Sequence, residues 1–161
     1  TGIDTRKTRD KYVEECSIET DQPALIPDSY LDVTSEKIRI YKQLDSLMSD
    51  KEVERLRNQI EDRFGPLPEE LENLFYVVKV RNMGARLGFE KIIIKNGLFI
   101  AFFISNQMSP YFKSPVFTRV LERVTALDPA YSLKQSEGRL KIVTRGVDTM
   151  SKALEILSKL Q

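Results

Sequence analysis

The stretch KIIIKNGLFIAFFI, residues 91–104, decides the fold class of this chain. β-Branched and aromatic residues, which favour strands, fill both of its halves. Between the halves stands Asn96-Gly97, the pair that most readily adopts the two positive φ angles of a type I′ turn. The stretch therefore predicts an antiparallel hairpin.

A second pair of strands is expected further along the chain. Residues 131–135 alternate in the manner of a strand, Glu137-Gly138 provides a turn, and Leu140 and Ile142 continue on the other side. The chain thus contains two predicted hairpins, each closed by a short turn.

The N-terminal part combines a strand with an extended segment. Residues 12–20 are rich in β-branched types and predict an imperfect strand. The two prolines within residues 22–30 exclude a helix interior there and favour extended backbone. We expect Leu25, Ile26 and Tyr30 to anchor this segment on the core.

Five helices are expected, because apolar side chains recur every three or four residues in five segments. Their first residues or caps are predicted at Thr34 or Ser35, near Asp50, at Pro68, at Ser114-Pro115 and at Asp148. The third helix should end at residues 87–88, and Gly84 inside it either lowers helix stability by about 1 kcal/mol or permits a close helix crossing. The apolar stripes of the first two helices are Ile38, Tyr41, Leu44, Leu47 and Met48, then Val53, Leu56, Ile60 and Phe64.

These elements predict an α+β fold. The order is strand, three helices, two strands, helix, two strands, helix. Tight turns within both strand pairs favour a mostly antiparallel sheet built from two hairpins plus an N-terminal strand, covered by about five helices.

Composition excludes several classes of function. The 161 residues include 25 Lys and Arg against 24 Asp and Glu, so the net charge of +1 gives no general attraction to nucleic acid or anionic membranes. The absence of histidine removes the commonest zinc ligand and the usual proton-transfer residue, and no Gly-Lys-Ser/Thr phosphate loop occurs. A single cysteine, Cys16, excludes an intramolecular disulfide. The most apolar run, residues 98–104, is far shorter than the roughly 20 residues that span a bilayer. We expect a cytoplasmic chain with no catalytic residue, cofactor or metal of its own.

One motif has a recognisable family pattern. The run IEDRFGPLP, residues 60–68, follows PDSY at 27–30 and KIRIYK at 37–42. Together these stretches resemble the C-terminal domain of the bacterial transcription-repair coupling factor, over about residues 25–160. The resemblance implies a parent protein that recognises RNA polymerase stalled at DNA damage, displaces it with a double-stranded DNA translocase driven by ATP and magnesium, and recruits the excision-repair protein UvrA. Residues 1–11 would then connect to the translocase, and residues 12–161 would form a single non-catalytic domain.

The resemblance also implies a docking site. In the family, the C-terminal domain packs on an N-terminal UvrB-like module and hides its UvrA-binding surface. Helical periodicity places Arg55, Gln59 and Asp62 away from the apolar stripe of the second helix, and Arg63 on its flank. By resemblance, these four residues form the interdomain contact through charge-assisted hydrogen bonds. Gln59 stands where the family motif has an acidic residue, which removes one charge. A plain alternative for Asp62 and Arg63 is a solvated helix-end pair that contributes about 0–1 kcal/mol.

A nucleic-acid-binding accessory module that assists the translocase is the second interpretation. The basic run within residues 6–11 and the aromatic pair Tyr111-Phe112 beside Lys113 could grip DNA, because aromatic and cationic side chains together form stacking platforms. The competing explanation is that the aromatic pair packs on the core and the basic run is solvated chain.

Overall fold

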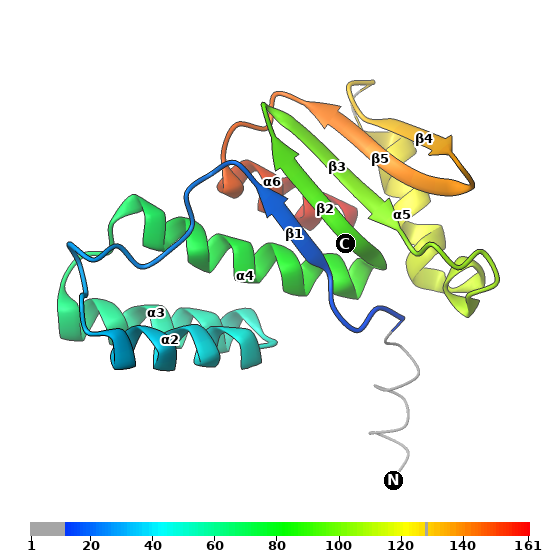
Figure 1. The fold of residues 1–161 in the computed structure, drawn as a ribbon. Coiled ribbons are helices and arrows are strands. Elements are labelled where there is room, and N and C mark those ends of the chain that lie inside the picture. The colour runs from blue at the N-terminus through cyan, green and yellow to red at the C-terminus, as the bar shows by residue number, and fades with distance from the viewer. Residues whose placement is uncertain (1–11, 128) are drawn as a thin grey trace, which may run out of the picture.

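The computed structural model describes residues 12–127 and 129–161, which form a mixed five-stranded sheet in the order β1-β2-β3-β5-β4 (Figure 1). β1 runs parallel to β2, and the other three neighbouring pairs are antiparallel. The mostly antiparallel sheet expected from the sequence is confirmed. The strands are β1 Ser17–Thr20, β2 Phe89–Lys95, β3 Leu98–Phe103, β4 Ser132–Ser136 and β5 Arg139–Arg145.

All five expected helices form, which confirms the α+β fold class. In Figure 1, α4 lies between the sheet and the antiparallel pair made by α2 and α3, while α5 and α6 cover the same face of the sheet as α4. The helices are α2 Thr34–Ser46, α3 Asp50–Phe64, α4 Glu69–Leu87, α5 Pro115–Ala126 and α6 Met150–Leu160, and a short 3-10 helix, η1 Pro110–Lys113, precedes α5.

Both predicted turns have the backbone that their sequences require. Asn96 and Gly97 have φ angles of 53° and 75°, and Glu137 and Gly138 have 53° and 74°. Two successive positive φ angles define the type I′ turn, whose twist matches that of the strands it joins.

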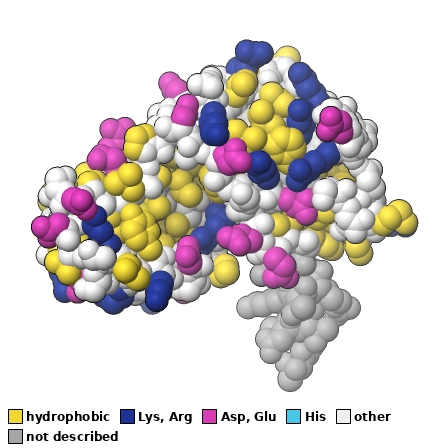
Figure 2. All heavy atoms as spheres, viewed as in Figure 1, with side chains coloured by type: hydrophobic (Ala, Val, Ile, Leu, Met, Phe, Trp, Pro, Cys, Tyr) yellow, Lys and Arg dark blue, Asp and Glu magenta, His cyan; other side chains and the backbone are white. Residues whose placement is uncertain are grey.

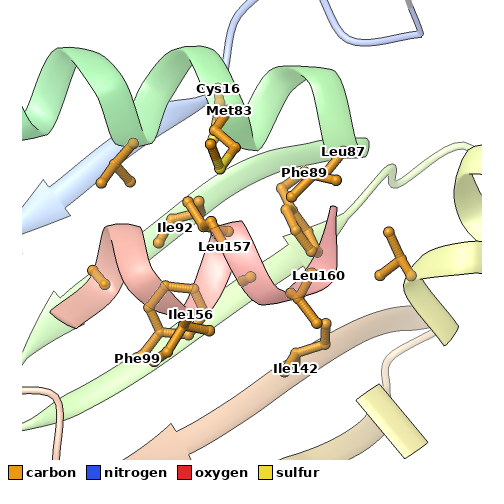
Figure 3. Packing of buried hydrophobic residues seen from close by; sticks show 14 of the residues in the cluster. Cys16, Met83, Leu87, Phe89, Ile92, Phe99, Ile142, Ile156, Leu157 and Leu160 are labelled. Carbon is orange, nitrogen blue, oxygen red and sulfur yellow. The ribbon is translucent and has the colours of Figure 1, made fainter. Parts of the chain in front are cut away.

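The larger of two cores lies between the sheet and α4, α5 and α6 (Figure 3). Phe89 and Ile92 of β2 and Phe99 of β3 pack here against Leu157 and Leu160 of α6. All five side chains are fully buried, so this layer of the molecule excludes water.

Gly84 allows α4 to approach this core closely. A Cβ atom at this position would lie 2.9 Å from both Cys16 Sγ and Ile92 Cδ1. These neighbours lie in β2 and just before β1, so the close helix crossing considered from the sequence was wrong. Gly84 instead lets α4 pack closely against the sheet.

The smaller core joins α2, α3 and the first half of α4. Val53, Leu56 and Ile60 of α3 are buried in it, as their spacing predicted, and Phe75 of α4 packs with them. Of the three expected anchors of the extended segment, Ile26 is buried here and Tyr30 is half-buried, whereas Leu25 is 44% exposed and the prediction for it was wrong.

The predicted stripe of α2 was right at Tyr41, Leu44 and Leu47, which lie in or against the smaller core, but it was wrong at two positions. Ile38 and Met48 are 49% and 58% exposed, while Ile40, which was left out of the predicted stripe, is 2% exposed. α2 packs against both α3 and α4, so the side of α2 that is buried depends on residues of α4, far along the chain. The N-terminal strand is shorter than expected, because Val13 and Cys16 enter the core without pairing to a neighbouring strand.

α3 begins at Asp50 as predicted, but most N-caps lie one residue from those predicted. Ser49, rather than Asp50, caps α3 by accepting a hydrogen bond from Glu52 N at 3.2 Å. Thr149, rather than Asp148, does the same for α6. Ser49 stands immediately before the predicted cap and Thr149 immediately after it, and each hydroxyl reaches the free backbone N–H three positions on. Similarly, Val33 precedes α2 without a side-chain cap and Pro68 occupies the N-cap of α4, whereas Ser114 caps α5 as expected.

Candidate docking surface

The three stretches that resemble the coupling-factor family meet at one end of the α2–α3 pair. Lys37 on α2 forms an ion pair with Asp28 of the extended segment. Tyr30 Oη donates a hydrogen bond to the carbonyl of Gly65 at 2.7 Å, and its ring packs edge-on against Phe64 with centroids 6.2 Å apart. These contacts fix the C-terminal end of α3, where the predicted docking residues lie.

The predicted docking residues form one exposed stripe on α3. Arg55, Gln59, Asp62 and Arg63 are all exposed. Steps of four, three and one residues keep them on a single side of a helix with 3.6 residues per turn. Arg55 and Asp62 have no ion-pair partner within residues 12–127 and 129–161. The helix therefore brings together all four residues.

Arg63 is already held by a contact that the sequence did not reveal. Its Nη2 donates to Glu36 Oε1 of α2 at 3.2 Å, and its guanidinium lies 4.9 Å from the Phe64 ring centroid. Arg39 donates to the other oxygen of Glu36 at 2.6 Å, and Arg39 and Arg63 together hold the pKa of the Glu36 carboxyl below its usual value. Glu36 precedes Arg63 by 27 residues, so no local pattern indicates this pair.

An apolar groove of about 200 Å³ lies beside this stripe, between α2 and α3. Its walls include Gln59 and Arg63 from the predicted set and Arg39 and Gln43 from α2. The sequence reasoning missed Arg39 and Gln43. If the apolar stripe of α2 is started at Ile40, helical periodicity places Arg39 and Gln43 on the same flank of that stripe, because Arg39 precedes Ile40 by one residue and Gln43 follows it by three. The other four lining residues are apolar: Ile40, Leu56 and Ile60, which are buried, and Phe64, which is half-buried.

The other side of α3 is fixed to α4 by ion pairs. Arg57 pairs with Glu72 and, at 3.7 Å, with Glu61, while Lys79 pairs with Glu54. A second, polar hollow of about 260 Å³ is lined by Glu54, Arg57, Glu72 and Lys79, together with Phe75 and Tyr76. The pairs of Arg57 with Glu72 and of Lys79 with Glu54 join the two helices, so the predicted docking residues lie on a side of α3 that α4 does not occupy.

The aromatic loop belongs to the core. Tyr111 is fully buried and donates a hydrogen bond to the carbonyl of Leu87 at 2.5 Å, and its ring centroid lies 5.4 Å from that of Phe112. Tyr111 is thus not accessible to a nucleic-acid base. The basic run of residues 6–11 lies outside the described residues.

No helix in the described part of the chain is long and apolar enough to cross a membrane. Within the same residues, no three His, Cys, Asp or Glu side chains are grouped so as to hold a metal ion.

Comparison with known proteins supports the family resemblance. The family model of the TRCF domain matches residues 20–114. The transcription-repair-coupling factor of Rickettsia prowazekii is 35% identical over 81 residues, which are 50% of this chain and 7% of that protein. The corresponding factors of Haemophilus influenzae and Bacillus subtilis are 32% identical over 98 residues and 36% identical over 78 residues, covering 60% and 48% of this chain. The matched region is less than a tenth of the length of each of these relatives.

A solved structure shows the same fold. The crystal structure of the C-terminal domain of transcription-repair coupling factor superposes with a TM-score of 0.76, and the match covers 91% of each chain at 16% sequence identity. The family model extends over more than half of the residues, from the end of β1 to the N-cap of α5. This chain therefore belongs to the TRCF domain family.

Proposed function

We propose that this chain is a non-catalytic regulatory domain that docks on the N-terminal UvrB-like module of its parent protein. Docking masks the UvrA-binding surface of that module until RNA polymerase and DNA are engaged, so the parent is autoinhibited in transcription-coupled nucleotide-excision repair. ATP and magnesium act in the motor of the parent, and the regulatory domain holds no cofactor. Family membership supports the general role.

The observation that supports docking through α3 is the apolar groove beside the exposed stripe. Gln59 and Arg63 line its rim, and Arg55 and Asp62 lie on the same face of the helix. Interfaces commonly have an apolar centre surrounded by polar groups that exclude water. The groove can receive one bulky apolar side chain from the partner module while the stripe makes polar contacts around it.

The charges of the stripe suit a reversible contact. Asp62, which has no ion-pair partner among the described residues, is available to an arginine of the partner. Arg63 is positioned by its ion pair with Glu36. Its guanidinium can keep this pair while it also binds a carboxylate of the partner, or can replace Glu36 by that carboxylate. Charged contacts at an interface rim contribute mainly to specificity and association rate and weaken as salt increases. Such a contact can be released when the motor engages.

The proposal is tested by titrating this chain against the separate UvrB-like module at low and at moderate salt. Changing both Asp62→Ala and Arg63→Ala should weaken binding at least about tenfold and should increase UvrA binding by the full-length parent. Glu155→Ala with Lys159→Ala is the matched control, because it removes one acid and one base from an ion pair on the exposed side of α6.

Folding of the double variant is checked by urea unfolding, so that loss of binding is not mistaken for loss of structure. If both variants fold and UvrA binding by the parent is unchanged by the α3 substitutions, the assignment of these residues is wrong. Binding of duplex DNA by this chain, with affinity that falls steeply with salt, would favour the accessory DNA-binding function instead.

A further inference from the structure

The face of the sheet opposite α4, α5 and α6 has a regular array of side chains. Along the central strands, the side chains of this array alternate with side chains that point to the opposite face. The latter, such as Ile92, Phe99 and Ile142, are fully buried in the larger core. Strand pairing aligns the outward residues in three rows across β2, β3 and β5. We call these nine positions the sheet grid: Lys91, Phe102 and Lys141; Ile93, Ile100 and Val143; Lys95, Leu98 and Arg145.

The sheet grid has cations at its four corners and apolar side chains at the other five positions. The corners are Lys91 and Lys95 on β2 and Lys141 and Arg145 on β5. Figure 2, which has the viewpoint of Figure 1, shows hydrophobic side chains gathered over the strands with Lys and Arg around them. The pattern is thus an apolar centre with a cationic rim.

The two sides of the sheet grid differ in charge. Glu19 on β1 pairs with Lys91 at 2.8 Å and with Lys95 at 3.4 Å, which neutralises part of the β2 side. On the β5 side, neither Lys141 nor Arg145 has a carboxylate within 4.0 Å among residues 12–127 and 129–161. Lys134 of β4 is aligned with Lys141 and adds a further cation. The uncompensated positive charge therefore lies along β5 and β4.

We propose that the sheet grid is a docking surface for an acidic amphipathic helix of a partner protein. The helix lies across the strands, with its apolar stripe on the row Ile93, Ile100 and Val143, and its flanking carboxylates contact Lys141 and Arg145. The opposite face of the sheet is already covered by helices, which is the usual way in which a sheet buries an apolar face.

The dimensions of the sheet grid fit this occupant. The two outer rows are four residues apart along each strand, which at about 3.3 Å per residue separates them by about 13 Å. An α-helix with its side chains is about 10–12 Å wide, so it fits between the outer rows. The middle row spans two strand spacings, about 10 Å, which corresponds to about two helical turns.

The same array is unsuited to single-stranded nucleic acid. Binding of bases on a sheet depends on aromatic rings on which they stack, and the middle row is entirely aliphatic. The one aromatic residue of the sheet grid, Phe102, already has the Arg139 guanidinium 4.9 Å and the Lys141 ammonium 5.7 Å from its ring centroid. Aliphatic side chains favour an apolar protein surface as the partner.

The test uses the isotope-labelled chain and NMR chemical-shift mapping with three probes. The first is a helical peptide with a leucine stripe flanked by glutamates, the second is the same peptide with lysine in place of glutamate, and the third is an oligothymidine strand. We expect the glutamate peptide to shift the amides of Ile93, Ile100 and Val143 and the lysine peptide to bind at least about tenfold more weakly.

Charge reversal provides the matched variants. Lys141→Glu with Arg145→Glu should weaken binding of the glutamate peptide at least about tenfold, whereas Arg119→Glu with Arg123→Glu, which makes the same change of net charge on exposed positions of α5, should leave it unaltered. Equal binding of both peptides, shifts confined to other elements, or preferential binding of the oligothymidine to these strands would overturn the proposal.

Discussion

Gly88 ends α4 in a conformation and an environment that only glycine tolerates. Its φ of 97° lies in the left-handed region, and an added Cβ would be 2.1 Å from Cε1 of Tyr111. Tyr111 is fully buried and its hydroxyl is bonded to the carbonyl of Leu87, so the ring has little room to move. Gly88→Ala should therefore lower the free energy of unfolding by at least about 2 kcal/mol, measured by urea denaturation.

Gly97 is the matched control for this substitution. Its φ of 75° also lies in the left-handed region, in a type I′ turn, but no atom lies within 4 Å of an added Cβ. Gly97→Ala should cost only the backbone strain, about 1–2 kcal/mol. An equal loss in the two variants would show that Tyr111 moves aside without cost.

Cys16 should be chemically inert in the folded protein. Burial raises the pKa of its thiol to about 12, and its side chain is 1% exposed. Since the thiolate is the reactive form, labelling by a disulfide reagent at pH 8 should be at least about a thousandfold slower than for a free thiol. Labelling at the free-thiol rate without denaturant would contradict this burial.

The raised pKa of Cys16 also predicts a pH dependence of stability. The folded state keeps the thiol proton more strongly than the unfolded state, whose pKa is near 9.0. The contribution of the buried thiol to the free energy of unfolding is thus fully present below pH 9 and decreases as pH rises toward about 12. Burial raises the pKa of Tyr111 as well, so urea unfolding as a function of pH should show a combined loss in alkaline solution.

At the scale of elements, α4 holds the end of α2 through two polar side chains. Arg81 Nη2 donates to the carbonyls of Leu44 and Leu47 at 3.2 Å each, and Asn82 Nδ2 donates to the same Leu47 carbonyl at 3.0 Å. Leu44 lies in the last turn of α2 and Leu47 is its C-cap, so their carbonyls are at the end of the helix, where few backbone N–H donors remain; the Leu44 carbonyl accepts one long bond of 3.4 Å from Leu47 N. Arg81→Met should lower the protection of α2 amides from hydrogen exchange by the equivalent of about 2 kcal/mol and leave β3 unchanged.

Arg86 offers the control for this prediction. It is exposed, and it donates one long hydrogen bond of 3.4 Å to the carbonyl of Met48. Arg86→Met should leave exchange in α2 within experimental error. If both variants behave alike, the contacts of Arg81 do not hold α2.

Apart from the exact N-caps of α3 and α6, the sequence predicted elements with a local cause and failed where the cause is distant. Asn96-Gly97 and Glu137-Gly138 specify their turns by themselves, and Ser114 caps its own helix. The buried face of α2 depends on α4, which follows more than twenty residues later, so Ile38 was chosen where Ile40 is buried. For the same reason the docking stripe was predicted on α3, but the groove beside it and the pairing of Arg63 with Glu36 were not.

At the scale of the whole molecule, the helix that the two cores share, among the residues that the structure describes, is α4. Leu71, Phe75 and Val78 of α4 are buried with α2 and α3, whereas Val80 and Leu87 are buried against the sheet. A segment with fewer buried apolar contacts opens at a lower free energy than the rest. The α2–α3 pair should therefore exchange its amides before the sheet does.

A pair of equivalent substitutions tests this division. Leu71→Ala in the smaller core and Leu157→Ala in the larger core both remove a fully buried leucine and should each cost about 2–5 kcal/mol locally. Leu71→Ala should weaken the protection of amides from hydrogen exchange in α2 and α3 but not at Phe99 or Ala101 of β3. Leu157→Ala should weaken the protection of these two β3 amides. Loss of protection at β3 in both variants would mean that the molecule unfolds as one unit.

The continuity of α4 also sets a distance. Its 19 residues, at about 1.5 Å per residue, form a rod of about 28 Å whose first half is fixed in one core and whose second half is fixed in the other. The groove on α2 and α3 and the outer face of the sheet are thus both held in place by α4. If two partners bound at these places at the same time, α4 would fix the distance and the orientation between them.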